Sequence, residues 1–281
     1  MKFAETFAVK LALEAGPDTL TTAAALGIAG VPIDGGQLLD DGVAATLGPL
    51  RKLGLEPCQA GAFFFNPLHP DPEERQQGAK RLRRLIPLSA EAGCRWIAFG
   101  AGSRHPDIFG GHDPDNLTEA ALEEAAAVLG PLAELARQHG VFLSLEPHIR
   151  SVIATPERAA ELCRRVGCEA LKITFDITNY YGFFDLLDPG SMIERCERAL
   201  GGITGLVHLK EVALQPGFHF HAGLVPIGSG RTDWKRVLRA AAQIAPADTW
   251  VVIEHCAGAE EAGNAVTIVR EASRAANLVI G

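Results

Sequence analysis

Four residues of types that bind metals or move protons each end or interrupt a short apolar segment of the chain. They are Glu146 in VFLSLEPH, Asp176 in ITFDITN, His208 in LVHLKE and Glu254 in VVIEHC. Carboxylates and imidazoles exchange protons in acid–base catalysis, and they are also ligands of divalent cations. Their chemistry depends on whether the fold brings these four side chains together.

The elements that must position them form a repeating pattern. Short apolar segments rich in strand-forming residues alternate with longer segments of helical periodicity along the whole chain. Strands are expected at 7–13, 30–33, 57–65, 96–101, 141–146, 171–176, 205–210 and 250–255, and helices at 73–92, 118–139, 188–200 and 260–277. This pattern predicts a single-domain (β/α)₈ TIM barrel over residues 1–281, because a doubly wound open sheet usually has fewer strands and a glycine-rich first turn, which is missing here.

A barrel of this kind would gather the four residues at one end. The carboxyl ends of all its strands meet at one mouth, where barrel enzymes carry their chemistry. The four residues end four successive expected strands and are 30, 32 and 46 residues apart, which is about one β–α unit each, the last one lengthened by a loop. Three carboxylates in one mouth would repel one another unless a cation holds them, and the simplest cation is a metal ion.

Each of the four residues also has a simpler explanation when it is taken alone. A single carboxylate after a strand commonly caps a helix or joins a surface ion pair, and a single histidine is commonly hydrogen-bonded in the core. Four such residues at four consecutive strand ends weaken that explanation. We therefore expect them to bind one divalent ion together. Their oxygen-rich set with one imidazole favours Mn²⁺, allows Mg²⁺, Co²⁺ or Zn²⁺, and excludes a thiolate-type zinc site.

The second half of the chain resembles the xylose isomerase-like TIM barrels. The resemblance covers about the last 140 residues through the segments LEPH, FDITN, VHLKE, PIGSGRTDW and VIEH, whereas the first half matches only by its β–α rhythm. This family contains sugar and sugar-phosphate isomerases and epimerases, inosose dehydratase and isomerase, and the endonuclease IV branch. The resemblance implies that the same four residues hold one divalent ion, which chelates neighbouring oxygens of a sugar or polyol.

The activity implied by the resemblance is that of a metal-dependent isomerase or epimerase. It would act on a sugar, a sugar phosphate or a related polyol or hydroxyketo substrate through an enediolate that the metal stabilises. Glu146 and Glu254 are expected to take and return the substrate proton. His148 is expected either to face the substrate or to order Glu146. Lys210 is expected either to hold a substrate oxygen or carboxylate, or to form a salt bridge with a neighbouring glutamate.

Three other functions stay open. A dehydratase or lyase of the inosose or dehydroshikimate type would use the same enediolate chemistry. An endonuclease IV-like repair nuclease is disfavoured by the net charge of −8 and by missing metal ligands. A degenerate barrel that binds without turnover is disfavoured because all four residues are present.

The chain also departs from relatives at particular positions. Asn179 stands where many of them carry a histidine three residues after the aspartate of strand six, and the arginine that keto-sugar epimerases place after strand seven is absent. The sequence assigns no role to four further histidines, which are His105, His112, His219 and His221.

The composition and the loops give expectations about partners. The acidic chain has no basic run, no segment approaching 18 apolar residues and no uninterrupted apolar N-terminus, so we expect a cytoplasmic protein with a small carbohydrate substrate and no nucleic-acid or membrane partner. The six scattered cysteines are expected to be reduced. Residues 63–66 and 99–103 are expected to line the mouth. A homodimer is expected, and residues 212–230 would rest on the partner or close over the mouth.

Overall fold

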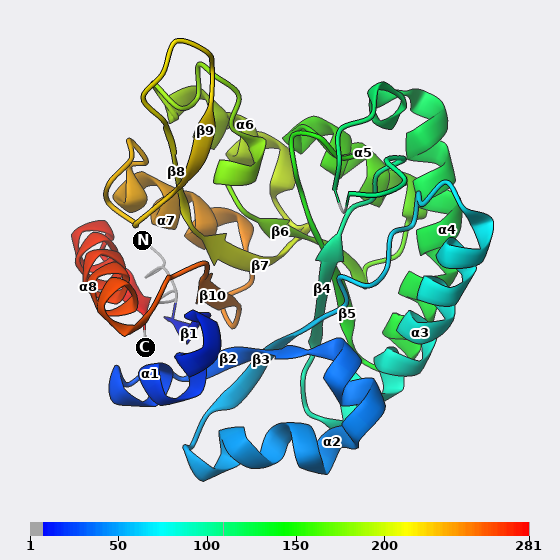
Figure 1. The fold of residues 1–281 in the computed structure, drawn as a ribbon, viewed down its shortest axis with the longest axis horizontal. Helices are drawn as coiled ribbons and strands as arrows, with labels where there is room; N and C mark the ends of the chain where they lie inside the picture. The colour runs from blue at the N-terminus through cyan, green and yellow to red at the C-terminus, as the bar shows by residue number, and fades with distance from the viewer. Residues whose placement is uncertain (1–7, 109, 281) are drawn as a thin grey trace, which may run out of the picture.

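The protein forms a closed ring of parallel strands surrounded by helices (Figure 1). The computed structural model describes residues 8–108 and 110–280, so Phe7, where the first expected strand begins, lies outside the described residues. The strands of the ring are β1 (Ala8–Leu13), β2 (Gly30–Asp34), β3 (Glu56–Gly61), β4 (Trp96–Gly100), β5 (Phe142–Glu146), β6 (Leu171–Phe175), β7 (Thr204–Leu209) and β10 (Trp250–Ile253). The ring closes where β1 pairs with β10, and Lys10 stands opposite Trp250. The expected (β/α)₈ TIM barrel is confirmed.

Each strand of the ring leads into a helix, either directly or through a loop. The helices are α1 (Thr19–Ala25), α2 (Gly35–Lys52), α3 (Pro72–Glu91), α4 (Glu119–Gln138), α5 (Pro156–Val166), α6 (Gly190–Leu200), α7 (Trp234–Ile244) and α8 (Ala259–Ala276). Their starts follow ordinary capping chemistry: Asp71 accepts a hydrogen bond from the backbone N–H of Glu73, and Pro72 occupies the first helical position. None of the helices in the described residues is long and apolar enough to cross a membrane.

Several short elements complete the chain. Within the described residues, three 3₁₀ turns lie between the longer elements: η1 (Gly16–Asp18), η2 (Pro114–Leu117) and η3 (Thr178–Tyr180). The strand β11 (Val279–Ile280) pairs with β1. Outside the ring, β8 (Glu211–Leu214) and β9 (Ala222–Val225) form an antiparallel hairpin that projects beyond the barrel next to the segment before α6 (Figure 1).

One expected strand is too long. The strand predicted at 57–65 ends at Gly61, because residues beyond it turn away to meet the loop that follows β4. The Asn66 side chain accepts hydrogen bonds from the backbone N–H groups of Leu68 and Ser103, both at 3.0 Å, and donates to the Ser103 carbonyl at 2.7 Å. This contact joins residues 37 positions apart, so local strand propensity could not reveal it.

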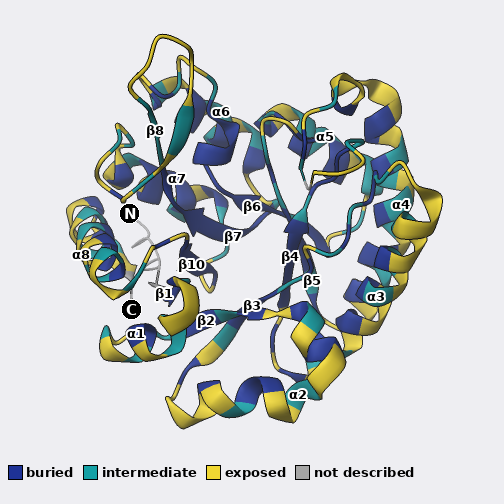
Figure 2. Cartoon of the chain, viewed as in Figure 1, coloured by how far each residue is buried: buried dark blue, intermediate teal, exposed yellow. Residues whose placement is uncertain are grey.

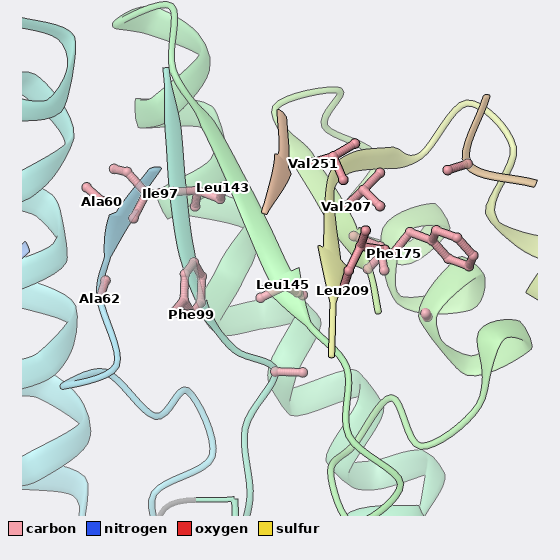
Figure 3. Close-up of a cluster of buried hydrophobic side chains, with 14 of the residues drawn as sticks. Ala60, Ala62, Ile97, Phe99, Leu143, Leu145, Phe175, Val207, Leu209 and Val251 are labelled. Carbon is pink, nitrogen blue, oxygen red and sulfur yellow. The ribbon is translucent and has the colours of Figure 1, made fainter. Parts of the chain in front are cut away.

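The alternation of side chains along the strands separates two apolar layers. Residues such as Ile97, Phe99 and Val207 pack between the strands and the helices, whose buried faces turn inward (Figures 2 and 3). The opposite faces carry a second cluster inside the barrel, made of Ala12, Cys58, Trp96, Ala98, Leu206, Trp250 and Val252. Because side chains alternate along a strand, positions two residues beyond Leu206 and Val252 also face the barrel axis. These positions are His208 and Glu254. All six cysteines are unpaired, as expected.

Candidate active site at the barrel mouth

The structure brings together all four residues that the sequence singled out. Glu146 ends β5, Asp176 follows β6, His208 lies in β7 and Glu254 follows β10. One potential ligand atom from each residue lies within 4.8 Å of those of the other three. Asp176, His208 and Glu254 are buried, and Glu146 is partly exposed. The convergence expected at the carboxyl ends of these strands is therefore present.

The imidazole of His208 has one bonded and one unbonded nitrogen. Its Nε2 lies 2.8 Å from the Gln59 side-chain oxygen, which can only accept, so Nε2 carries a proton. Its buried Nδ1 lies 3.1 Å from Glu254 Oε2, within ion-pair distance, but forms no aligned hydrogen bond with any described residue. An outer hydrogen bond of this kind fixes the tautomer of a metal-binding histidine. Nδ1 is thus the nitrogen left for a cation.

Electrostatics around His208 follow from its acidic neighbours. Burial lowers its pKa, but the carboxylates of Glu254, Glu146 and Asp176 outweigh burial and raise the pKa to about 9. Without a metal, His208 is therefore protonated at neutral pH. Because a ligating imidazole must be neutral, a metal ion bound here would displace a proton from His208.

Asn179 connects two of the carboxylates. Its side-chain amide donates to Asp176 Oδ2 at 2.8 Å and to Glu146 Oε1 at 2.9 Å. Asp176 Oδ1 additionally accepts from the Thr178 hydroxyl at 2.9 Å and from the Asn179 backbone N–H at 3.3 Å. The asparagine that replaces a histidine of many relatives therefore orients both carboxylates.

Lys210 supplies the cation among the carboxylates in this structure. Its buried ammonium donates to Asp176 Oδ2, lies 2.5 Å from Glu254 Oε1 and 3.4 Å from Glu146 Oε1. The salt bridge that was one of two expectations for Lys210 is present. The single charge of this ammonium offsets part of the repulsion among the three carboxylates.

The pKa values of the two glutamates shift in opposite directions, for different reasons. Burial raises the pKa of Glu146. Burial also acts to raise the pKa of Glu254, but Lys210 and His208 outweigh it and hold that pKa well below its ordinary value. For Lys210, burial is likewise outweighed by Asp176, Glu254 and Glu146, so its pKa lies well above the ordinary value.

The donor set fits a divalent cation. Three carboxylates and one imidazole match the hard or borderline ions Mg²⁺, Mn²⁺, Co²⁺ and Zn²⁺, and the buried Nδ1 of His208 has no other hydrogen-bond partner in the described chain. The ammonium of Lys210 contacts the same three carboxylates. A metal ion bound by the four residues would need these same oxygens. It would therefore compete with the Lys210 ammonium in its present position.

A cavity of about 380 Å³ opens above the cluster. Glu146 and Glu254 line it, whereas Asp176, His208 and Lys210 lie beneath its surface. Of the segments expected to line the mouth, 63–66 contributes Phe63 and Asn66, and 99–103 contributes all of its residues after Phe99. Phe65 and Tyr180 are buried in the core, and Phe109 lies outside the described residues.

His148 lines the cavity but is not bonded to Glu146. Its Nδ1 accepts from the backbone N–H of Arg150 at 3.2 Å. Burial, with smaller contributions from the cations Arg150 and Lys210, lowers its pKa to about 4, so its ring is neutral at pH 7. Of its two expected roles, the position in the cavity wall is the one compatible with facing a substrate.

The sequence reading missed three features of the mouth. Gln59 is a buried amide within the apolar strand β3, Glu14 directly follows β1, and both line the cavity. His255 directly follows Glu254 with a φ of 59°, in the left-handed region. The position of Glu14 immediately after an apolar strand is the same signal that identified the other carboxylates. Gln59 could have been found in the sequence because it is an amide within an otherwise apolar strand.

The remaining histidines take no part in this mouth. His105 Nδ1 accepts from the backbone N–H groups of Asp107 and Ile108 and so stabilises its own loop. His112, His219 and His221 are exposed. None of these four histidines is among the described residues that line the cavity.

Comparisons with known proteins agree with this architecture. The family model of the xylose isomerase-like TIM barrel matches residues 20–275. No curated protein sequence matches the chain at a significant level.

Solved structures share the fold at low sequence identity. A xylose isomerase-like TIM barrel protein from Mycobacterium smegmatis in complex with magnesium superposes with a TM-score of 0.72 at 16% identity, over 95% of this chain and 97% of that chain. D-psicose 3-epimerase from Clostridium cellulolyticum H10 with D-tagatose gives 0.70 at 17%, over 94% and 98%. The probable 3-DHS dehydratase AsbF from Bacillus anthracis gives 0.70 at 15%, over 93% and 98%. The chain belongs to the xylose isomerase-like TIM barrel family.

Proposed function

We propose that the protein is a divalent-metal-dependent isomerase or epimerase of a sugar or related polyhydroxylated ketone. The observation that carries the proposal is the convergence of Glu146, Asp176, His208 and Glu254 within 4.8 Å beneath a cavity of about 380 Å³. Family membership supports sugar-directed chemistry, and structural neighbours include an epimerase solved with a ketose.

The four residues would hold the metal ion. When bound, a divalent ion supplies charge stabilisation for the enediolate that forms when a proton leaves the carbon beside a carbonyl. We favour Mn²⁺ within the set that the ligands accept. The Nε2–H bond from His208 to Gln59 supports this assignment, because it keeps Nδ1 available as a ligand.

Glu146 and Glu254 would move the substrate proton. They are the two members of the cluster that line the cavity, so their carboxylates meet a substrate directly. They come from β5 and β10, which are separated by β6 and β7 in the ring, so they approach the substrate from different sides. Asn179 would hold Glu146 in position, and His148 would donate to a substrate oxygen. Lys210 would bind a substrate oxygen once its ammonium leaves the carboxylates.

Isotope exchange with metal analysis tests the proposal. The purified protein is analysed for metal content and incubated in D₂O with ketoses, inososes and hydroxypyruvates. We expect about one divalent ion per chain, and deuterium at the carbon next to the carbonyl of recovered substrate and of its isomer. Loss of water with formation of an unsaturated product would instead identify a dehydratase.

Matched variants make the test specific to the site. Glu254→Gln should abolish deuterium incorporation, whereas Glu260→Gln, an exposed position in the first turn of α8, should leave it unchanged. If the protein binds no divalent ion, and the four single substitutions leave metal content unaltered, the four residues are structural and the enzyme assignment fails.

We also propose a cytoplasmic homodimer that does not bind nucleic acid or membranes. The segment 212–230 contains the β8–β9 hairpin, whose tip exposes Phe218 by 98% and Phe220 by 60%. Phe220 stacks edge-on with Phe183, at 5.3 Å between ring centroids. Exposed aromatic groups of this kind favour protein contacts. Light scattering should give twice 29.8 kDa at micromolar concentration, and the mass of one chain would count against the dimer.

A further inference from the structure

Glu14 occupies the wall of the mouth opposite the end of β5. It directly follows β1, and its backbone N–H donates to the Ile253 carbonyl at 2.8 Å, which fixes it beside the strand end that carries Glu254. In the ring order, β1 and β5 are four strands apart and so face each other across the eight-stranded barrel. The cavity therefore has Glu14 on one side and His148 with Arg150 on the other.

The carboxylate of Glu14 has no partner within the described chain. It is partly buried, yet it forms no side-chain hydrogen bond or ion pair with any residue in 8–108 or 110–280. Its oxygens are not among the fully buried unpaired atoms of the described residues, so they are accessible from the cavity that Glu14 lines. The cavity is where the missing donors would lie. Hydroxyl groups of a bound molecule would supply them.

The charges around the cavity restrict what can lie next to Glu14. The neighbouring carboxylate of Glu254 also lines this side, so a phosphate or carboxylate group here would meet two negative charges. Arg150 lines the cavity on the far side and is exposed, and its guanidinium is in no ion pair with any described residue. Uncharged hydroxyl groups fit the Glu14 side, and repulsion excludes anions from it.

We propose that Glu14 is a specificity-determining residue that accepts hydrogen bonds from substrate hydroxyls and selects unphosphorylated polyols over their phosphate esters. This inference rests on the proposed function, and it narrows the substrate class of that same site. A neutral ketose would bind with its polyhydroxylated tail at Glu14 and its carbonyl end over Glu146 and Glu254. No covalent step is assigned to Glu14.

Binding measurements with the metal-loaded protein test the proposal. The probes are D-fructose and D-tagatose, together with the 6-phosphate of each, in titration calorimetry. We expect the wild type to bind the neutral ketoses more tightly than their phosphates. Glu14→Gln should weaken binding of the neutral ketoses about tenfold, because a charged acceptor becomes neutral, and should bring the phosphates closer to them in affinity.

A nearby control separates this effect from a general loss of acidic charge. Asp18 is exposed in the same connection between β1 and α1. Asp18→Asn should change neither the affinity for neutral ketoses nor the affinity for their phosphates. Metal content and thermal midpoint are measured for each variant. Glu14→Gln should retain both, because Glu14 is outside the four-residue cluster.

The outcomes for Glu14 and for the proposed function can be told apart. Equal affinities of wild type and Glu14→Gln for both classes of probe, a wild-type preference for phosphates, or no binding of either class would overturn the inference. A wild type that binds the ketoses through Glu14 but neither isomerises them nor exchanges their protons would overturn the proposed function alone. A wild type that turns over neutral ketoses with no change in KM in Glu14→Gln would overturn the inference alone.

Discussion

The two halves of the barrel mouth are built in different ways. The ends of β5, β6, β7 and β10 carry charged side chains that are mostly buried and bonded to one another. The ends of β3 and β4 carry loops whose backbone, Phe63 and Asn66 line the open cavity. The first half holds the groups proposed to bind metal and move the proton, and the second lines the cavity where a ligand would lie. The difference indicates that changes in the first half should affect metal binding and rate, while changes in the second should affect affinity for substrate.

Removal of the Lys210 ammonium should have the largest effect. Lys210→Met leaves protonated His208 as the remaining cation among three carboxylates, and breaking a buried ion pair by removing one partner costs about 3–5 kcal/mol. The metal-free variant should therefore unfold at a lower temperature than the wild type, and saturating Mn²⁺ should restore much of the loss.

Thermal unfolding by circular dichroism, with and without Mn²⁺, measures this difference. Lys172→Met serves as the control, because the Lys172 ammonium donates only to the Gly202 carbonyl at an exposed site. A metal-induced shift of the midpoint that is no larger in Lys210→Met than in the wild type would contradict the prediction.

Glu254→Gln should separate catalysis from metal binding within the first half. We expect a rate loss on the order of 10²-fold or more, as for a missing general acid or base, even when metal occupancy is restored. Steady-state kinetics at saturating Mn²⁺, with metal content measured on the same sample, check this. Recovery of the wild-type rate with added metal would show that Glu254 serves only as a ligand.

Asp176→Asn should give the complementary result. The amide keeps an oxygen that can ligate but loses the charge, so metal affinity should fall about tenfold or more, and excess Mn²⁺ should recover part of the activity. Calorimetric titration with Mn²⁺ measures the affinity. A loss of activity with metal affinity unchanged would place Asp176 in the reaction itself.

A change in the second half should have the smallest effect. Phe63 lines the cavity and is 43% exposed. Phe63→Ala removes apolar surface from a ligand contact. Loss of a complete apolar contact in a pocket typically costs about 1–3 kcal/mol of binding free energy, and loss at a half-exposed site costs less. We expect a several-fold increase in KM with kcat and metal content unchanged. A fall in kcat equal to that of Glu254→Gln would remove the distinction between the two halves.

The half of the mouth formed by the ends of β5, β6, β7 and β10 could be predicted well from the sequence, because strand ends follow a local rule. The alternation of side chains placed His208 and Lys210 on the same inward face, and the four strand ends indicated convergence before any contact was known. What the sequence could not reveal are contacts between distant segments. Gln59 meets His208 across 149 residues, and the pairing of β2 with β3 shifts register between Val31 and Pro32.

The position of the Lys210 ammonium was also beyond a local rule. It depends on the relative placement of three strand ends, so the sequence left a substrate contact and a salt bridge as alternatives. Glu14, in contrast, carries the same signal as Glu146, a carboxylate directly after an apolar strand, but no family motif marks it because the first half of the chain matches relatives only by its β–α rhythm.

The exposed aromatic rings of the β8–β9 hairpin determine how the protein should respond to ionic strength. Phe218 and Phe220 of the hairpin are exposed, as are Phe183 and Phe184 in the neighbouring segment before α6, and Phe183 contacts both Phe184 and Phe220. Each molecule has a net charge of −8, so two copies repel each other at low salt, while contact between aromatic surfaces is apolar. Salt screens the repulsion and leaves the apolar attraction in place. Association through this hairpin should therefore strengthen as salt is added, whereas an interface held by ion pairs would weaken.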